Sequence, residues 1–261
     1  MKKLLKNVWI WIVLLFMYAP ILVLSLYSFT DSTMIGSIRN FSVDNYVTLF
    51  TTPELVEMII GTLALALGVA ILSTILGTIG AVGAHYSKKG FRSLIEMINQ
   101  LPVVNADVVT GFSVCILMIV IFRIPKDTFI PLVIGQVTLC VPFVYLSVLP
   151  RLKQLDKAYF EAALDLGCTP MKALRKVVLP QIVPGIISGF MTALTLSLDD
   201  YFIATYTKPA TFDTISTDVV NATRGSQTEI KTALWALSTI IFIVVVLVVL
   251  WSNRKGNRGN E

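Results

Sequence analysis

Long apolar runs alternate with short polar stretches along almost the whole chain. A helix that crosses a bilayer needs about 20 mostly apolar residues, and six runs reach roughly that length. The pattern predicts membrane spans at about residues 8–29, 58–84, 94–122, 129–149, 182–205 and 233–251. We therefore expect an all-α membrane protein with a single transmembrane domain over residues 1–261.

The polar stretch 150–181 predicts two short helices joined by a tight turn. Asp156 suits the N-cap of a first helix, and Gly167 suits the left-handed residue that ends it. Thr169 and Pro170 suit the N-cap and the first position of a second helix. We expect the second helix to end at Leu179-Pro180.

Small residues recur four positions apart in two of the predicted spans. This spacing allows helix backbones to approach closely in lipid, so we expect the second span to be central and the fifth to pack along its small-residue face. The second span has Ala64 and Gly68, then Ser73, Gly77 and Ala81, and the fifth has Gly185, Gly189, Ala193 and Ser197.

Composition and charge support a membrane location and give an orientation. Hydrophobic residues make up 55% of the chain and charged residues 14%. Placing both termini in the cytoplasm puts most of the 21 Lys and Arg residues inside, as the positive-inside rule requires, and only Arg39, Arg123, Lys126, Lys208, Arg224 and Lys231 outside. The net charge of +5 is then a topology signal, and no aromatic-basic surface suggests nucleic-acid binding.

Other features exclude simple alternatives. The amino-terminal apolar run is too long for a signal peptide and lacks a small-residue cleavage site, so we expect an uncleaved span. Cys115, Cys140 and Cys168 show no metal-ligand spacing and are expected to be free thiols. His85, the single histidine, falls at the inner end of the second span and is interpreted as a membrane-edge residue.

Acidic residues occur within the third and fifth spans. Asp107 follows Pro102 and Asn105 in the third span, and Asp199 and Asp200 are near the outer end of the fifth. A charge at membrane depth is costly, so each should face protein or water. Either reading remains open: they line a cation path, or they cap broken helix ends. We expect Asp199 to line the path.

The 150–181 loop also carries a recognisable pattern of residues. Glu161-Ala162-Ala163 is followed after three residues by Gly167 and after nine more by Val177-Val178-Leu179-Pro180. This resembles the cytoplasmic loop of permease subunits in binding-protein-dependent ABC importers, with Val177 in place of the usual Ile. The resemblance implies a type I importer fold and a coupling helix that docks on an ATPase. The coupling residues would be Glu161, Ala162, Ala163, Gly167, Leu179 and Pro180.

The rest of the chain resembles the polyamine (spermidine/putrescine) branch of these permeases, in particular the second of its two permease subunits. The matching stretches are Asn45-Tyr46, Leu101-Pro102, residues 106–109, residues 140–143 and residues 196–200. The resemblance implies a small cationic solute, a second permease subunit, an ATPase dimer and an extracytoplasmic binding protein. Asp107, Asp199 and Asp200 would belong to the substrate path. Related branches carry thiamine, iron or phosphonates.

No catalytic or metal-binding residues are expected in this chain. It has no Gly-x-x-x-x-Gly-Lys-Ser/Thr loop, so we expect it to bind no cofactor, ATP and Mg being used by the partner ATPase. The expected location is the bacterial cell membrane. An ion-gradient-driven secondary transporter is the main rival; a membrane-embedded enzyme would need a nucleophile-base pair or metal cluster that the sequence does not offer.

Overall fold

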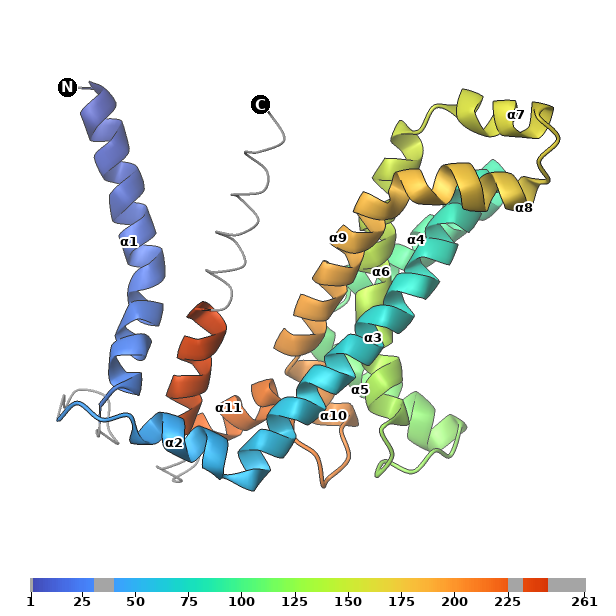
Figure 1. Ribbon diagram of the computed structural model, residues 1–261. Helices are drawn as coiled ribbons and strands as arrows, with labels where there is room; N and C mark the ends of the chain where they lie inside the picture. The colour runs from blue at the N-terminus through green and yellow to red at the C-terminus, as the bar shows by residue number, and fades with distance from the viewer. Residues whose placement is uncertain (1, 31–39, 225–231, 244–261) are drawn as a thin grey trace. The chain divides into compact units, whose positions relative to one another are not determined.

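The computed structural model describes residues 2–30, 40–224 and 232–243, which are helical over most of their length (Figure 1). Residues 58–218 form one compact unit, and residues 1–57 with residues 219–261 form another. Four described helices are long and apolar enough to cross a membrane, or five if a bent pair counts as one span. The all-α class is confirmed for these residues, whereas the expected six spans are reached only in part.

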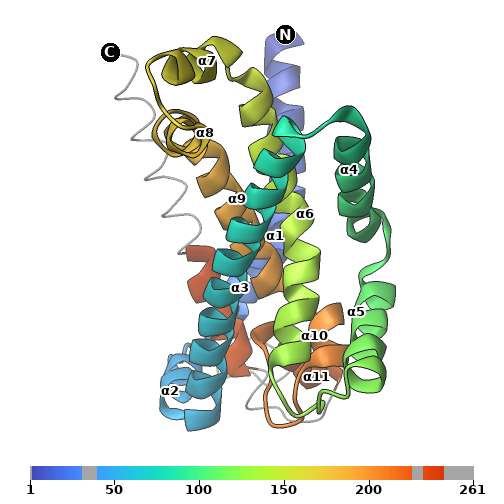
Figure 2. The same ribbon diagram turned by 90° about the vertical axis from the view of Figure 1, so that its right-hand side faces the viewer.

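The unit of residues 58–218 contains most of α3 and all of α4 to α10. In Figures 1 and 2, α3, α6 and α9 run alongside one another, with α7 and α8 at one end of them and α10 at the other. The bounds are α3 (Pro53–Tyr86), α4 (Lys89–Val104), α5 (Asp107–Ile116), a π-helical turn (Leu117–Ile121), α6 (Ile130–Gln154), α7 (Lys157–Asp165), α8 (Pro170–Ala173), a second π-helical turn (Leu174–Val178), α9 (Leu179–Asp199) and α10 (Phe202–Thr207).

The core of this unit lies where α3 and α9 meet α6. A Cβ atom on Gly77 of α3 would lie 2.7 Å from Cβ of Val144, and one on Gly189 of α9 would lie 3.0 Å from its Cγ1. A side chain at Gly77 would therefore clash with Val144, and one at Gly189 would require Val144 to shift slightly, so the two glycines allow both helices to lie close to α6. The predicted packing is confirmed for two small-residue faces, because every residue in them is buried. These are Ser73, Gly77 and Ala81 of the second predicted span and Gly185, Gly189, Ala193 and Ser197 of the fifth.

The other small pair of the second span behaves differently. Ala64 and Gly68 are exposed, and a Cβ atom on Gly68 would meet nothing within 4 Å. The expectation that this pair also brings helices together is wrong within the described chain. Small residues four positions apart show that another helix could pack closely there, but they do not show which face of the helix is packed in the fold.

The predicted third span, 94–122, is not one helix. α4 ends at Val104 and α5 begins at Asp107, with a break between them (Figure 2). The two helices are bent by 107° relative to each other. Asn105 and Ala106 between them are extended, with ψ of 145° and 136°. The break follows from local chemistry, because Pro102 removes a helical donor and Asp107 is favoured in the first turn of a new helix.

The predicted stop at Leu179-Pro180 is also wrong. Residues Pro170–Asp199 form one helical run of 30 residues. The π-helical turn ends at Val178, two residues before Pro180, and the amide of Leu179 donates to the carbonyl of Leu174. A widened turn and a proline both interrupt the usual i to i−4 ladder. Placed together, they allow the helix to continue from the loop into the predicted fifth span.

The fifth span ends earlier than residue 205. α9 stops at Asp199, Asp200 is extended with ψ of 114°, and α10 starts at Phe202. An acid that accepts hydrogen bonds from the first amides of a helix favours a new start. The break therefore coincides with Asp200.

The unit of residues 1–57 and 219–261 contains α1 (Lys2–Ser28), α2 (Asp44–Thr51) and an apolar helix, Thr232–Ile243. The first predicted span is confirmed as Trp9–Ser28, whereas residues 244–251 of the sixth lie outside the described residues. The rings of Tyr27 and Trp235 lie 5.9 Å apart. α11 (Ile215–Arg224) begins in the other unit.

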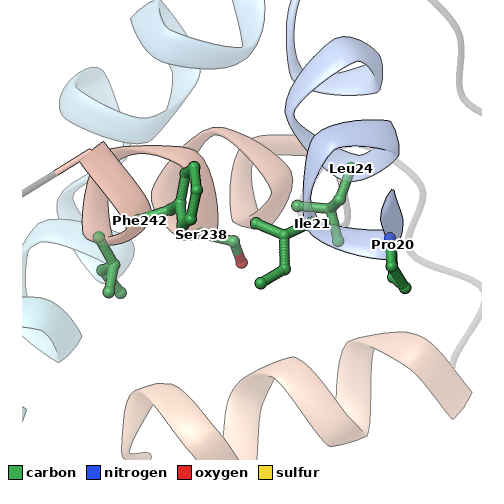
Figure 3. Close-up of a pocket in the computed structure, with 6 residues that line it drawn as sticks. Pro20, Ile21, Leu24, Ser238 and Phe242 are labelled. Atoms are coloured by element: carbon green, nitrogen blue, oxygen red, sulfur yellow. The ribbon is translucent and has the colours of Figure 1, made fainter. Parts of the chain in front are cut away.

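A hollow of about 410 Å³ lies between α1 and the 232–243 helix. Its lining is almost entirely apolar, with the hydroxyl of Ser238 as the exception (Figure 3). Nothing in this lining recognises a charged solute. The residues are Pro20, Ile21, Leu24, Ser238, Ile241 and Phe242.

Candidate functional site

The predicted docking loop begins with a capped helix. The carboxylate of Asp156 accepts a hydrogen bond from the amide of Ala158 at 3.0 Å, and α7 follows directly. Ala163 of α7 is buried, whereas Glu161 and Ala162 are exposed. α7 packs on α8 and on the π-helical turn after it. The exposed side of α7, with Glu161, is thus available to another protein.

The turn between α7 and α8 has the predicted chemistry. Gly167 has φ of +83°, in the left-handed region that glycine adopts without strain. Its amide donates to the carbonyl of Leu164, and the amide of Cys168 donates to that of Ala163. Pro170 opens α8 as expected, while the side chain of Thr169 makes no capping bond. Leu179 and Pro180, predicted to close the loop, instead begin α9.

Phe160 of α7 packs against the end of α3. Phe160 packs against the buried core, and its ring centroid lies 5.2 Å from that of Tyr86, at the end of α3. Hollows of about 410 Å³ and 370 Å³ both have Phe160 and Tyr86 in their walls. His85 and Glu161 line the first hollow, and Gly83 lines the second. α7 is therefore held by an aromatic contact with open space beside it.

Asp200 serves as a buried N-terminal cap for α10. Its carboxylate accepts hydrogen bonds from the amides of Ile203 and Ala204, both at 3.0 Å, and from the side chain of Gln136 at 3.1 Å. Ser197 of α9 donates to the same Gln136 side chain at 2.7 Å. Gln136 is fully buried and so connects α6 to the end of α9 and the start of α10.

Asp199 and Asp107 lie in different surroundings. Both are exposed, and neither side chain has a hydrogen bond or ion pair among the described residues. Asp199 is the last residue of α9, and Asp107 is the first residue of α5. α5 and α10 pack together, with a Cβ on Gly111 only 2.9 Å from Cα of Ile203. The fold thus places the start of α5 and the end of α9 in one region.

Two contributors to these sites were missed in the sequence. Gln136 stands in an otherwise apolar run, and a buried amide in a span is itself a sign of a hydrogen-bonded network. Phe160 precedes Glu161 and has no comparable signal, since an aromatic residue on a short helix is ordinary. The three cysteines are free, as expected. No cluster of metal-ligating side chains occurs within the described ranges.

Comparison with known proteins gives a family. Residues 73–258 match the model of the family described as binding-protein-dependent transport system inner membrane component. The putrescine transport system permease protein PotI of Escherichia coli (strain K12) is 34% identical over 243 residues, covering 89% of this chain and 84% of that protein. The spermidine/putrescine transport system permease protein PotC of Haemophilus influenzae is 27% identical over 254 residues, covering 97% and 98%.

Solved structures support the fold. A chain of a bacterial ABC transporter involved in import of the acidic polysaccharide alginate aligns with a TM-score of 0.75 and 22% identity, covering 97% of this chain and 94% of that one. At this identity the similarity concerns the fold. Both curated relatives above are named as permease proteins of transport systems. This chain belongs to the family of inner membrane components of binding-protein-dependent transport systems.

Proposed function

We propose that this chain is a permease subunit of an ATP-driven polyamine importer in the bacterial inner membrane. Relatives named for putrescine and for spermidine/putrescine transport align over most of their length. The permease would form one side of the translocation path. A second permease subunit, an ATPase dimer and an extracytoplasmic binding protein would complete the importer, and ATP and Mg would be bound by the ATPase.

The observation that carries ATP coupling is the α7–α8 loop. α7 has an exposed face with Glu161, the left-handed Gly167 fixes the turn, and α8 continues without a stop into a candidate membrane span. A partner that moves α7 would therefore act on a continuous helical run, Pro170–Asp199, that is long and apolar enough to cross the membrane. This is the arrangement expected of a point where an ATPase transmits its conformational change.

The exposed acids support a cationic solute. A carboxylate on the last residue of a helix is disfavoured by the helix dipole by about 0.3–1 kcal/mol, and a charge at membrane depth costs more. Asp199 is in that position, and no described hydrogen bond or ion pair offsets the cost. A residue that stabilises neither its helix nor its neighbours is well explained by contact with a passing cation. Asp107 is also exposed, while Asp200 is occupied as a cap.

A four-component reconstitution tests the proposal. The chain is co-expressed with its second permease, ATPase and binding protein in cells lacking polyamine uptake, and labelled putrescine is followed. We expect uptake that disappears with a hydrolysis-deficient ATPase and persists when the ion gradient is collapsed at constant ATP. Uptake that follows the ion gradient and needs no ATPase would establish the secondary-transporter alternative. ATP-dependent uptake of another solute, with no competition by polyamines, would establish a different substrate.

A further inference from the structure

Polar side chains form a stripe along almost the whole length of α9. Gln181, Ser188, Thr192, Thr195 and Asp199 are separated by seven, four, three and four positions, which places them on one side of an α-helix. We call this set the polar stripe; Thr192 is partly buried, and the other four residues are exposed. At 1.5 Å per residue the stripe extends over about 27 Å, close to the thickness of about 30 Å of the hydrocarbon core of a bilayer.

The polar stripe separates two other faces of α9. On one side of it lie the small residues of the fifth predicted span, which are buried against α6. On the other side lie Val183, Ile187 and Met191, which are 39%, 54% and 54% exposed. A polar and an apolar face of the same helix are therefore exposed side by side.

The polar stripe is poorly suited to contact lipid. A charge or an unpaired polar group in hydrocarbon is costly, and the side chains of Gln181, Ser188 and Asp199 have no hydrogen bond among the described residues. The hydroxyls of Thr192 and Thr195 donate to backbone carbonyls one turn earlier, at 3.0 Å and 2.9 Å, which leaves their oxygens as acceptors. The stripe therefore requires water or polar protein groups along its length.

A water-filled space explains the length of the polar stripe better than helix packing does. Helices in lipid pack through small residues with a few hydrogen bonds between them, and α9 already uses its small residues in this way against α6. A protein partner would need a matching polar group at every level from Gln181 to Asp199, whereas water can pair with each of them. A route for a polar solute has the same requirement, since it must be polar at every depth.

We propose that the polar stripe of α9 lines a water-filled path across the membrane, while Val183, Ile187 and Met191 face away from that path. The stripe belongs to the same helical run, Pro170–Asp199, that begins at the α7–α8 loop. A movement of this loop would therefore shift the lining of the path without an intervening element. The assignment rests on the proposed function and identifies the face of this chain along which the solute moves.

Cysteines at equal depth on the two exposed faces test the assignment. In the assembled importer in nanodiscs, the three native cysteines are first replaced by alanine or serine. Ser188→Cys and Thr192→Cys then place a thiol on the polar stripe, and Ile187→Cys and Met191→Cys, one position earlier in each case, are the matched controls. With the water-soluble trimethylammonium-ethyl methanethiosulfonate, we expect the stripe thiols to react at least about tenfold faster, because the reactive thiolate forms in water and not in hydrocarbon. Thr195→Cys provides a further stripe position if one of the two variants fails to assemble.

Labelling of the stripe should also block transport. The reagent adds a bulky group to the lining of the path, so the labelled stripe variants should lose most of their putrescine uptake in proteoliposomes, and the labelled controls should keep it. Equal rates on the two faces, stripe thiols left unreactive under a second permease subunit, or stripe labelling without loss of uptake would each overturn the assignment. The labelling rates need no transport. They can therefore fail while the parent importer still takes up putrescine with ATP, and that uptake alone decides the proposed function.

Discussion

Asp199 and Asp200 are adjacent in the chain, yet their side chains have opposite environments. Asp200 is 7% exposed and accepts hydrogen bonds from two α10 amides and from Gln136. Asp199 is exposed without a described partner. One acid therefore belongs to the folded structure, and the other is available to a solute.

Asparagine at each position separates these roles. An Asn at 200 has one carbonyl oxygen and an NH2 group that would face donors, so at least one buried bond is lost at about 1–3 kcal/mol. We expect Asp200→Asn to lower the apparent melting temperature in detergent and the amount of inserted protein. Asp199→Asn should leave both unchanged and reduce putrescine uptake. Equal melting temperatures for the two variants would contradict this assignment.

The sequence could indicate which residues are unusual but not which role each has. Asp107, Asp199 and Asp200 are conspicuous because charges are rare in spans. The cap at Asp200 depends on where α9 ends and on Gln136, which is 64 positions away and is brought there by the packing of α6 on α9. Gly167 was predictable because its role is local: a left-handed residue after a short helix favours glycine whatever surrounds it.

At the scale of elements, a proline inside a predicted span, Pro102, and a proline just before one, Pro180, had different effects on their helices. After Pro102 the helix breaks, and the next helix is bent by 107° relative to it. At Pro180 the helix instead continues, and a π-helical turn precedes the proline. The sequence around Pro102 contains Asn105 and Asp107, which favour a helix end and a new start. Pro180 is followed by Gln181, Ile182 and Val183, none of which favours a helix end, and the helix continues. The residues after a proline thus carry as much information as the proline.

The aromatic contact between α7 and α3 leads to a prediction about coupling. An aromatic pair contributes about 0.5–1.5 kcal/mol beyond its buried area, so losing the Phe160–Tyr86 contact should reduce uptake by roughly two- to tenfold. We expect Phe160→Ala to retain the bound ATPase and its ATP hydrolysis, measured with uptake in the same proteoliposomes. The number of solutes carried per ATP should fall.

Two further variants show whether this contact has the expected role. Phe160→Leu keeps most of the volume and should recover part of the uptake. Phe91→Ala removes an aromatic ring that is 59% exposed on α4 and has no ring contact among the described residues, and it should behave as the parent does. If Phe160→Ala carries as many solutes per ATP as the parent, the contact is structural only.

At the scale of the whole molecule, orientation in the membrane follows from charges spread along the chain. The basic residues of the loop, including Arg151, Arg175 and Lys176, belong to the side predicted to be cytoplasmic, whereas few basic residues flank the other helix ends. No single helix carries this information. It also could not be read from the fold, because the same helices could be inserted in either direction.

Cys168 provides a native reporter of this orientation. It is a free thiol of intermediate exposure, next to Gly167 in the α7–α8 turn. A membrane-impermeant maleimide should label it in inside-out vesicles and not in right-side-out vesicles, since the charge bias places this turn in the cytoplasm. Thr211→Cys, at an exposed position after α10, should show the reverse pattern when Cys168 is replaced by serine. Labelling of Cys168 from the outside would place α7 where no cytoplasmic ATPase could reach it and would refute both the topology and the coupling role.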